Sequence, residues 1–313
     1  MPESLQNIKR RAKGVKNINQ ITKAMELVAA TKMRKSQEIA LASRPYAFAA
    51  LHLLKNLTQI EDAAEHTPLL QHREIAKRAY VLMTSDKGLA GAFNSNIIRQ
   101  FEKFAAAEDI DFADHKNSFI AIGQKAAHYL ERHATHFEHR FIRVGDYATS
   151  AEVKPIAELL IKGYLDGRWD EVIIFSTHFR TALRQDVLER RILPVTFESI
   201  KKTAKEIIPE HGRFADLNKE QKIKDKERTE YLIEPAPEII LHNLTEHLVM
   251  MEIYDLILEA NASEHAARRV AMKNASDNAE ELVDALNLEY NKSRQAAITR
   301  EIIEIVAGAE SLQ

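Results

Sequence analysis

The sequence predicts an α+β fold in which two long terminal helices pair as a coiled coil and an α/β domain is inserted between them. Residues 238–307 contain neither Gly nor Pro, and as one helix they would extend about 105 Å at about 1.5 Å per residue. Residues 15–44 are also free of both. Between these segments, short β-forming runs alternate with helical stretches, which is typical of an α/β domain. The expected parts are an N-terminal helix over 1–60, an α/β domain over 75–235 and a C-terminal helix over 236–313.

Apolar residues recur at steps of three and four along both terminal segments. In the N-terminal segment this stripe comprises Leu5, Ile8, Ala12, Val15, Ile18, Ile21, Met25 and Val28. In the C-terminal segment it comprises Leu241, Leu244, Leu248 and Met251, then Met272, Ala275, Ala279, Leu282 and Leu286, and finally Ile298, Ile302, Ile305 and Ala309. Stripes this narrow are typical of a coiled-coil seam, with ordinary amphipathic helices as the alternative.

Charge is distributed unevenly between the two ends of the chain. Residues 1–36 hold nine basic and two acidic residues, a net charge of +7, whereas residues 238–313 hold six basic and fourteen acidic residues, a net charge of −8. A lone basic helix would suggest a nucleic acid or a membrane surface. Because the same chain carries an acidic complement, we expect the two helices to pair with each other.

The middle of the chain reads as alternating strands and helices. Strands are expected at 79–86, 118–123, 171–179 and 190–197, and helices at 92–107, 123–133 and 151–166. This order predicts a largely parallel sheet. Sixteen of the 32 residues in 199–230 are charged, so we expect that segment to be a solvated excursion of the domain.

No motif in the sequence predicts an active site or a cofactor. The stretch "SDKGLAGAFNSN" (85–96) follows a strand and opens a helix, but no Gly-Lys-Ser/Thr follows it, so a tight turn is favoured over a nucleotide site. His133, His136 and His139 are spaced by three but straddle an element boundary, which favours solvated histidines over a zinc site. The absence of Cys excludes disulfides and thiol chemistry, and no run of 18 apolar residues predicts a membrane span.

Three long motifs resemble one known family, the γ subunit of F-type ATP synthases. They are "IKRRAKGVKNINQITKAMELVAATKMRKSQ" (8–37), "SDKGLAGAFNSN" (85–96) and the segment 262–310 that begins "ASEHAARRVAMKNASDNAEEL". The resemblance implies a long antiparallel coiled coil of the N- and C-terminal helices with an inserted Rossmann-like α/β domain. It also implies a non-catalytic rotor in the central stalk. Such a rotor couples transmembrane proton flow to ATP synthesis by rotating inside the catalytic hexamer of alpha and beta subunits. The epsilon subunit and the membrane c-ring are its other implied partners.

The resemblance also implies roles for particular residues. Contacts with the catalytic head are expected from Met25, Lys87, Ala90, Arg294, Gln295, Thr299 and Glu301. An apolar bearing tip is expected from Ile298, Ile302, Ile303, Ile305 and Val306, and a contact with the membrane ring from Tyr231 and Glu234. The start of the chain lacks a presequence, so we expect a peripheral protein on the cytoplasmic side of a bacterial inner membrane. A nucleotide-binding α/β enzyme and a coiled-coil scaffold without a rotary role are the alternatives.

Overall fold

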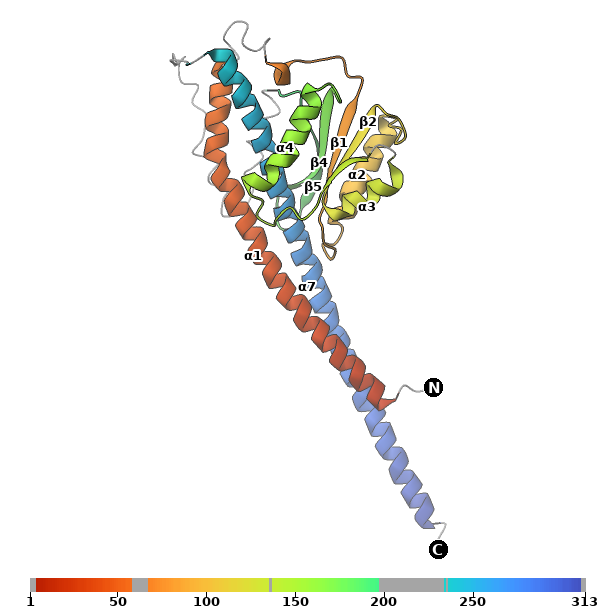
Figure 1. Cartoon of the computed structure of the whole chain (residues 1–313). Helices are drawn as coiled ribbons and strands as arrows, with labels where there is room; N and C mark the ends of the chain where they lie inside the picture. Colours follow the sequence, from red (N-terminus) through yellow and green to blue (C-terminus); the bar gives the residue numbers. More distant parts are fainter. Residues whose placement is uncertain (1–3, 58–66, 135–136, 197–233, 235, 311–313) are drawn as a thin grey trace. The chain divides into compact units, whose positions relative to one another are not determined.

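The computed structural model describes residues 4–57, 67–134, 137–196, 234 and 236–310 (Figure 1). The expected charged excursion, 199–230, lies outside these residues. In chain order the elements are α1 (Leu5–Leu57), η1 (Pro68–Leu70), β1 (Arg78–Met83), α2 (Phe93–Ala107), β2 (Asn117–Ile122), α3 (Gln124–His133), β3 (Phe137–Phe141), α4 (Ser150–Leu165), β4 (Glu171–Phe179), β5 (Gln185–Leu193) and α7 (Pro237–Glu310). The chain divides into two compact units, one of Met1–Ala29 with Arg269–Gln313 and one of Ala30–Arg268.

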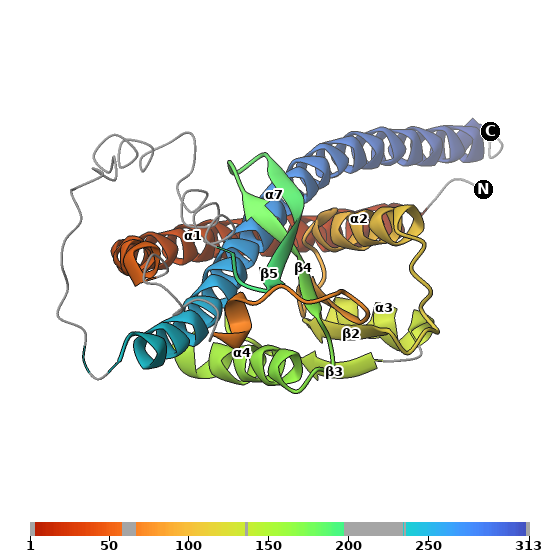
Figure 2. The same cartoon turned by 90° about the horizontal axis from the view of Figure 1, so that it is seen from above.

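The Ala30–Arg268 unit is built on a five-stranded sheet of order β3-β2-β1-β4-β5. β1 pairs in parallel with β2 and β4, β2 pairs in parallel with β3, and β5 pairs antiparallel with β4. A largely parallel sheet needs helices on both faces. Figure 2 shows the strands lying between α2 and α4, which confirms the predicted inserted α/β domain.

Two strands depart from the sequence prediction. β5 begins at Gln185, five residues before the predicted run, because its first half, "QDVLE", mixes polar and apolar residues. β3, "FEHRF", is absent from the prediction. It is an edge strand whose three central residues are exposed, and edge strands often carry charges in place of an apolar pattern.

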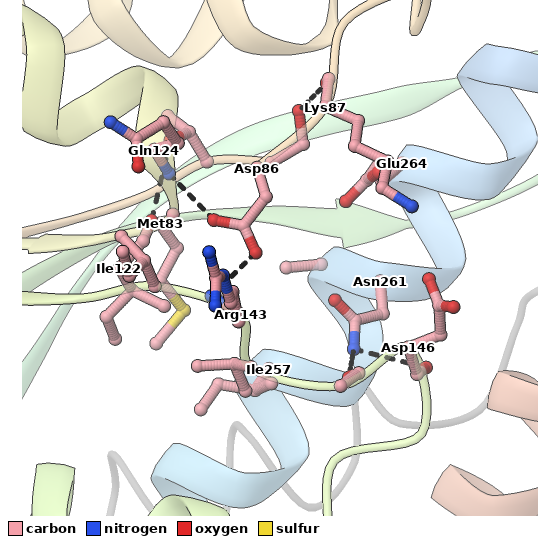
Figure 3. Close-up of a pocket in the computed structure, with 17 residues that line it drawn as sticks. Met83, Asp86, Lys87, Ile122, Gln124, Arg143, Asp146, Ile257, Asn261 and Glu264 are labelled. Atoms are coloured by element: carbon pink, nitrogen blue, oxygen red, sulfur yellow. Dashed lines mark hydrogen bonds between the residues drawn. The ribbon is translucent and has the colours of Figure 1, made fainter.

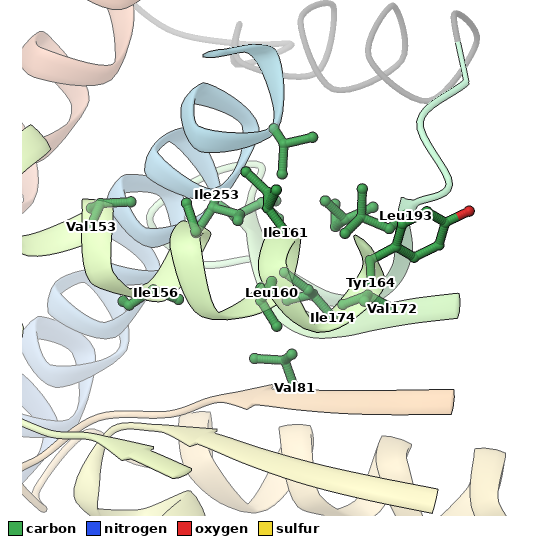
Figure 4. Close-up of a cluster of buried hydrophobic side chains, with 14 of the residues drawn as sticks. Val81, Val153, Ile156, Leu160, Ile161, Tyr164, Val172, Ile174, Leu193 and Ile253 are labelled. Carbon is green, nitrogen blue, oxygen red and sulfur yellow. The ribbon is translucent and has the colours of Figure 1, made fainter. Parts of the chain in front are cut away.

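The sheet separates two apolar cores, because successive residues of a strand point to opposite faces. On β1, Tyr80 and Leu82 pack with α2 and α3, whereas Val81 and Met83 pack with α4 and α7. Figure 4 shows the second core, in which Ile253 of α7 joins side chains of α4, β1 and β4. Part of α7 is therefore a structural layer of this unit.

Within the same unit α1 and α7 run antiparallel. Ser43 Oγ donates a 2.8 Å hydrogen bond to Asp255 Oδ1. Met33, earlier on α1, packs on Ala262 and Ala266, later on α7. Because the order of contacts is opposite along the two helices, the antiparallel pairing implied by the family resemblance is confirmed.

The second unit pairs residues 5–29 of α1 with residues 269–310 of α7 (Figure 1). Its seam follows steps that alternate strictly between three and four. On α1 the buried or half-buried seam positions are Leu5, Ile8, Ala12, Val15, Asn19, Thr22, Glu26 and Ala29, and on α7 they are Met272, Ser276, Ala279, Val283 and Leu286.

The predicted apolar stripe is wrong at four positions of this seam. Ile18, Ile21 and Val28 are 54–59 % exposed, and Leu282 of α7 is 45 % exposed. Helices that stay in contact need an average period of 3.5 residues. Two successive steps of three, from Val15 to Ile18 to Ile21, drift away from that period, so polar residues occupy the seam instead.

Gly163→Ala in α4 is expected to destabilise the protein. A Cβ atom at this position would lie 1.9 Å from Cζ2 of the buried Trp169 ring. Overpacking costs about 1–3 kcal/mol, more than the roughly 1 kcal/mol that Ala gains over Gly inside a helix. The measurement is the free energy of unfolding by denaturant. Gly14→Ala in α1 is the control and should be neutral or stabilising, because no atom lies within 4 Å of its added Cβ. A Gly163→Ala protein as stable as wild type would contradict this packing.

Candidate functional site

The turn between β1 and α2, residues 84–92, lies against the N-terminus of α3. The first N–H groups of a helix are where an α/β fold usually binds phosphate. Here three of them already have protein acceptors: Gln124 N donates to Asp86 Oδ1 at 2.9 Å, Lys125 N to Ser85 O at 3.2 Å, and Ala126 N to Thr84 Oγ1 at 2.7 Å. A phosphate group could bind there only by displacing these bonds.

Gly123 permits this close approach of the turn to α3. Its φ is +94°, and a Cβ atom would lie 2.0 Å from Thr84 O. Because an L side chain rarely adopts that backbone conformation and would also clash, only Gly fits. The geometry of the turn is thus fixed by the backbone.

A cavity of about 530 Å³ opens beside the turn, lined by the ends of β1 and β2, residues 142–146 and α7 (Figure 3). Its size would suit a small molecule. Its three carboxylates, however, already have protein partners: Asp86 accepts from Arg143 N, Asp146 pairs with Lys32 Nζ, and Glu264 pairs with Arg268. These acidic groups therefore hold the fold together around the cavity.

Burial controls the charge of the groups behind this cavity. It lowers the pKa of His265 to about 4, so the imidazole is neutral at pH 7 although its Nε2 lies 3.2 Å from Asp146 Oδ1. Partial burial would raise the pKa of Asp146, but the hydrogen bond from Lys32 lowers it overall. Asn261 Nδ2 donates to Gly145 O at 3.0 Å. The 145–146 loop is therefore tied to both long helices within this unit.

Arg268 of α7 holds the 84–92 turn in place. Its Nη2 donates to Gly88 O at 3.3 Å and pairs with Glu264 Oε1 at 2.6 Å. Of the two predicted head contacts here, Lys87 is exposed, whereas Ala90 is only 2 % exposed and packs in the core beside α2. Leu89 has a φ of +61° and is 64 % exposed, so it is the apolar side chain that the turn presents to solvent.

The other predicted contact residues lie on the two long helices or before α7. Met25 is half-buried, and Arg294, Gln295, Thr299 and Glu301 are exposed. The predicted tip residues, Ile298, Ile302, Ile303, Ile305 and Val306, are 48–71 % exposed. Glu234 is exposed, and Tyr231 lies outside the described residues. Their roles stay predictions.

Sequence reasoning missed an exposed apolar face on α1. Ile18, Ile21, Leu27 and Val28 are all more than half exposed. The signal that could have found them is the strict alternation of three and four, which assigns Asn19, Thr22 and Ala29 to the seam and leaves their apolar neighbours outside it.

A buried cluster of charged groups lies between α7, the sheet and α1. Glu259 of α7 accepts from His178 Nδ1 at 2.7 Å and lies 3.5 Å from Arg190 Nη2. Asp255, one helical turn earlier, accepts from Ser43. Directional contacts therefore reinforce the apolar packing that holds α7 in this unit.

Two of the three histidines noted in the sequence lie on separate elements of the described structure. His133 Nδ1 lies 2.7 Å from Tyr129 O at the end of α3, His139 lies on β3, and His136 falls outside the described residues. No group of His, Asp and Glu within the described ranges could hold a metal ion. Nor does any helix in the part of the chain that the structure describes have the length and apolar character needed to cross a membrane.

The combination of two long paired helices and a largely parallel α/β sheet in one chain has a counterpart among solved structures. A chain of the Euglena gracilis mitochondrial ATP synthase, from a structure of OSCP, F1 and the c-ring in rotational state 3, has the same fold. It is 19% identical, with a TM-score of 0.62 over 98% of this chain and 94% of that one.

The sequence comparisons identify the family. The ATP synthase family model matches residues 4–312. The ATP synthase gamma chain of Moorella thermoacetica is 36% identical over 309 residues, 99% of each chain, and that of Opitutus terrae is 39% identical over 304 residues, 97% of each chain. The chain therefore belongs to the ATP synthase gamma chain family. Gamma chains form the rotating central stalk of a membrane-associated complex and carry no catalytic site, as the sequence predicted.

Asp255→Asn is expected to flatten the pH dependence of stability. Burial raises the pKa of Asp255 to about 7; the bond from Ser43 opposes this, whereas Glu259 and Glu252 add to it. Its unfolded value is about 3.9, so the folded state binds the proton more tightly, and the stabilisation is lost as pH rises from about 4 to 7. Asn stays neutral and can still accept from Ser43.

The free energy of unfolding, measured from pH 4 to pH 8, should therefore fall less in the variant and exceed the wild-type value at pH 8 by about 1 kcal/mol or more. Glu280→Gln, at an exposed position of the same helix, is the control and should retain the wild-type slope. An unchanged slope in Asp255→Asn would mean that this carboxyl is ionised throughout the range.

Proposed function

We propose that this chain rotates as the shaft of a bacterial F-type ATP synthase and couples transmembrane proton flow to ATP synthesis in a surrounding hexamer of alpha and beta subunits. The observation that carries the proposal is the apolar end of α7, where Ile298, Ile302, Ile303, Ile305 and Val306 are 48–71 % exposed. Apolar clusters on a protein surface mark interaction sites. A sleeve within the hexamer would cover this one.

Apolar contact suits a bearing for physical reasons. The hydrophobic effect is non-directional and depends on the area removed from water, so turning the tip within an apolar sleeve costs little at any angle. Hydrogen bonds depend on direction and would resist each step. The tip can therefore be both buried and free to turn.

Polar residues near the tip and on the 84–92 turn would supply contacts that depend on the angle. Arg294, Gln295, Thr299, Glu301 and Lys87 are exposed, and Met25 is half-buried. Ala90 is buried and would not touch a partner itself; its packing in the core would hold the turn so that Leu89 stays exposed. A shaft that meets three identical catalytic subunits with different sides stabilises a different conformation in each, which is the differential interaction that a conformational drive requires.

The foot of the shaft would lie before α7. There Glu234, with Tyr231, would contact the membrane c-ring, and the epsilon subunit would complete the stalk. This arrangement would hold the chain peripherally on the cytoplasmic side of a bacterial inner membrane.

A nucleotide-binding enzyme fits the 84–92 turn less well. The α3 N–H groups that a phosphate would need already donate to Thr84, Ser85 and Asp86. A scaffold without a rotary role would cover the same apolar tip, and the coupled ATP synthesis measured below distinguishes it from a rotor.

The double variant Ile302→Asp with Ile305→Asp is expected to impair assembly or torque. Each buried carboxylate would cost several kcal/mol of desolvation in an apolar sleeve. The measurements are the stoichiometry of the purified complex and its rate of coupled ATP synthesis. Glu304→Gln on the same turns is the control, since it introduces no charge. Normal coupled synthesis by the double Asp variant would contradict an apolar bearing.

Changes at the two ends of the shaft should have different effects. Met25→Lys would place a cation against the catalytic subunits. If this cation forms an ion pair at one rotation angle only, each 1.4 kcal/mol of extra stabilisation slows rotation out of that angle about tenfold. We expect ATP hydrolysis to be partly retained and pumping to be poor. Tyr231→Ala with Glu234→Ala should instead weaken the contact between this chain and the membrane c-ring, and should leave ATP hydrolysis by the soluble head nearly intact.

The measurements are ATPase activity of the soluble head and ATP-driven pumping in membranes for both variants. The proposed orientation would be wrong if Tyr231→Ala with Glu234→Ala abolished ATP hydrolysis by the soluble head while Met25→Lys left ion pumping normal.

A further inference from the structure

Asn19 of α1 and Ser276 of α7 form a reciprocal pair inside the seam of residues 5–29 and 269–310. Asn19 Nδ2 donates to Ser276 O at 3.1 Å, and Ser276 Oγ donates to Asn19 Oδ1 at 3.2 Å. Both ends of the Asn19 amide are thus used by one residue of the other helix. Ser276 is buried.

A competing packing of α1 is available in the same sequence. Ile18, Ile21, Met25 and Val28 each directly precede a seam position. Turning α1 by one residue, about 100° around its own axis, would bring this apolar stripe against α7 and move the polar positions into water. Over residues 18–28 apolar burial favours the turned packing, whereas over residues 5–15 it favours the present one, because the turn would expose Leu5, Ile8 and Val15. Over residues 18–28, therefore, a specific interaction must oppose the turn.

We propose that the Asn19–Ser276 pair fixes the rotational phase of α1 on α7 and so keeps the apolar stripe on the outer surface. In the turned packing Asn19 leaves Ser276, and both hydrogen bonds are lost. A single buried Asn selects one arrangement of a coiled coil in this manner.

Thr22, the next seam position, cannot select the phase. Its hydroxyl bonds to Ile18 O and Asn19 O, each at 3.0 Å, within its own helix. These bonds would survive a rotation of α1. Of these two polar seam residues, only Asn19 therefore distinguishes the two packings of α1.

The functional consequence rests on the proposed rotor function. If the shaft acts on the catalytic subunits through its outer face, the phase of α1 decides whether Ile18, Ile21 and Val28 can touch them. Asn19 and Ser276 are then positioning residues that meet no partner protein themselves.

The first test measures the phase on the full-length chain, which has no Cys of its own. Ile21→Cys introduces one reporter thiol at an exposed position, and its alkylation by a maleimide is timed. Adding Asn19→Ala should slow alkylation at least about threefold, because residue 21 turns into the seam. Gln20→Ala, at the exposed neighbouring position, is the matched control and should change nothing.

The exchanged pair, Asn19→Ser with Ser276→Asn, should restore the wild-type alkylation rate because an amide again faces a hydroxyl. An unchanged rate in Asn19→Ala, or no recovery in the exchanged pair, would overturn the proposal. This assay needs no other subunit, so its outcome is independent of the rotor function.

The second test uses the assembled complex, with the natural residue at position 21. Asn19→Ala should lower the ions pumped per ATP hydrolysed at least about twofold, while the exchanged pair and Gln20→Ala keep the wild-type ratio. If the chain does not act as a rotor, the wild-type complex itself should hydrolyse ATP without pumping ions. Normal pumping by Asn19→Ala, together with slowed alkylation, would overturn the functional consequence.

Discussion

Two helices paired through a seven-residue repeat touch each other with only two residues of every seven. The remaining faces of α1 and α7 must therefore meet water or something else. In the Ala30–Arg268 unit α7 turns a free face to the sheet, where Ile253 enters a core with α4 and β1. In the other unit the free faces include the exposed residues of α1 and the tip of α7. One narrow seam thus lets the same helix be a core element in one place and an open surface in another.

The contacts of α7 change in kind along its length. Where it joins the α/β body they are directional as well as apolar: Asn261 donates to Gly145 O, Ser263 to Thr177 O and Arg268 to Gly88 O. Directional bonds in a low-dielectric interior hold one geometry. Between Ile298 and Val306 five large apolar side chains are exposed, interspersed with charged ones. Attachment to the body and an exposed apolar surface thus use different side chains along the same helix.

Much of the fold could be predicted from the sequence, because long segments free of Gly and Pro and short β-forming runs are local signals. β4 coincides with its predicted run of 171–179. The edge strand β3 could not be predicted, since its polar residues carry no buried pattern. Apolar character places Ile18 and Ile21 in the predicted seam, although the 3.5-residue period excludes them. Ser276, which accepts a hydrogen bond from Asn19, lies 257 residues away in sequence. The inward packing of Ala90 likewise depends on tertiary contacts with α2.

The position of α7 in the body has a consequence for biosynthesis. A ribosome completes β1, α4 and β4 before residues 237–268 exist, so the apolar face that includes Val81, Ile156 and Ile174 lacks one of its covering layers until then. Uncovered apolar surface and unfinished sheets are prone to aggregation during synthesis. The body therefore completes its folding only after nearly the whole chain has been translated. A product truncated before α7 keeps that face bare and is open to chaperones and proteases.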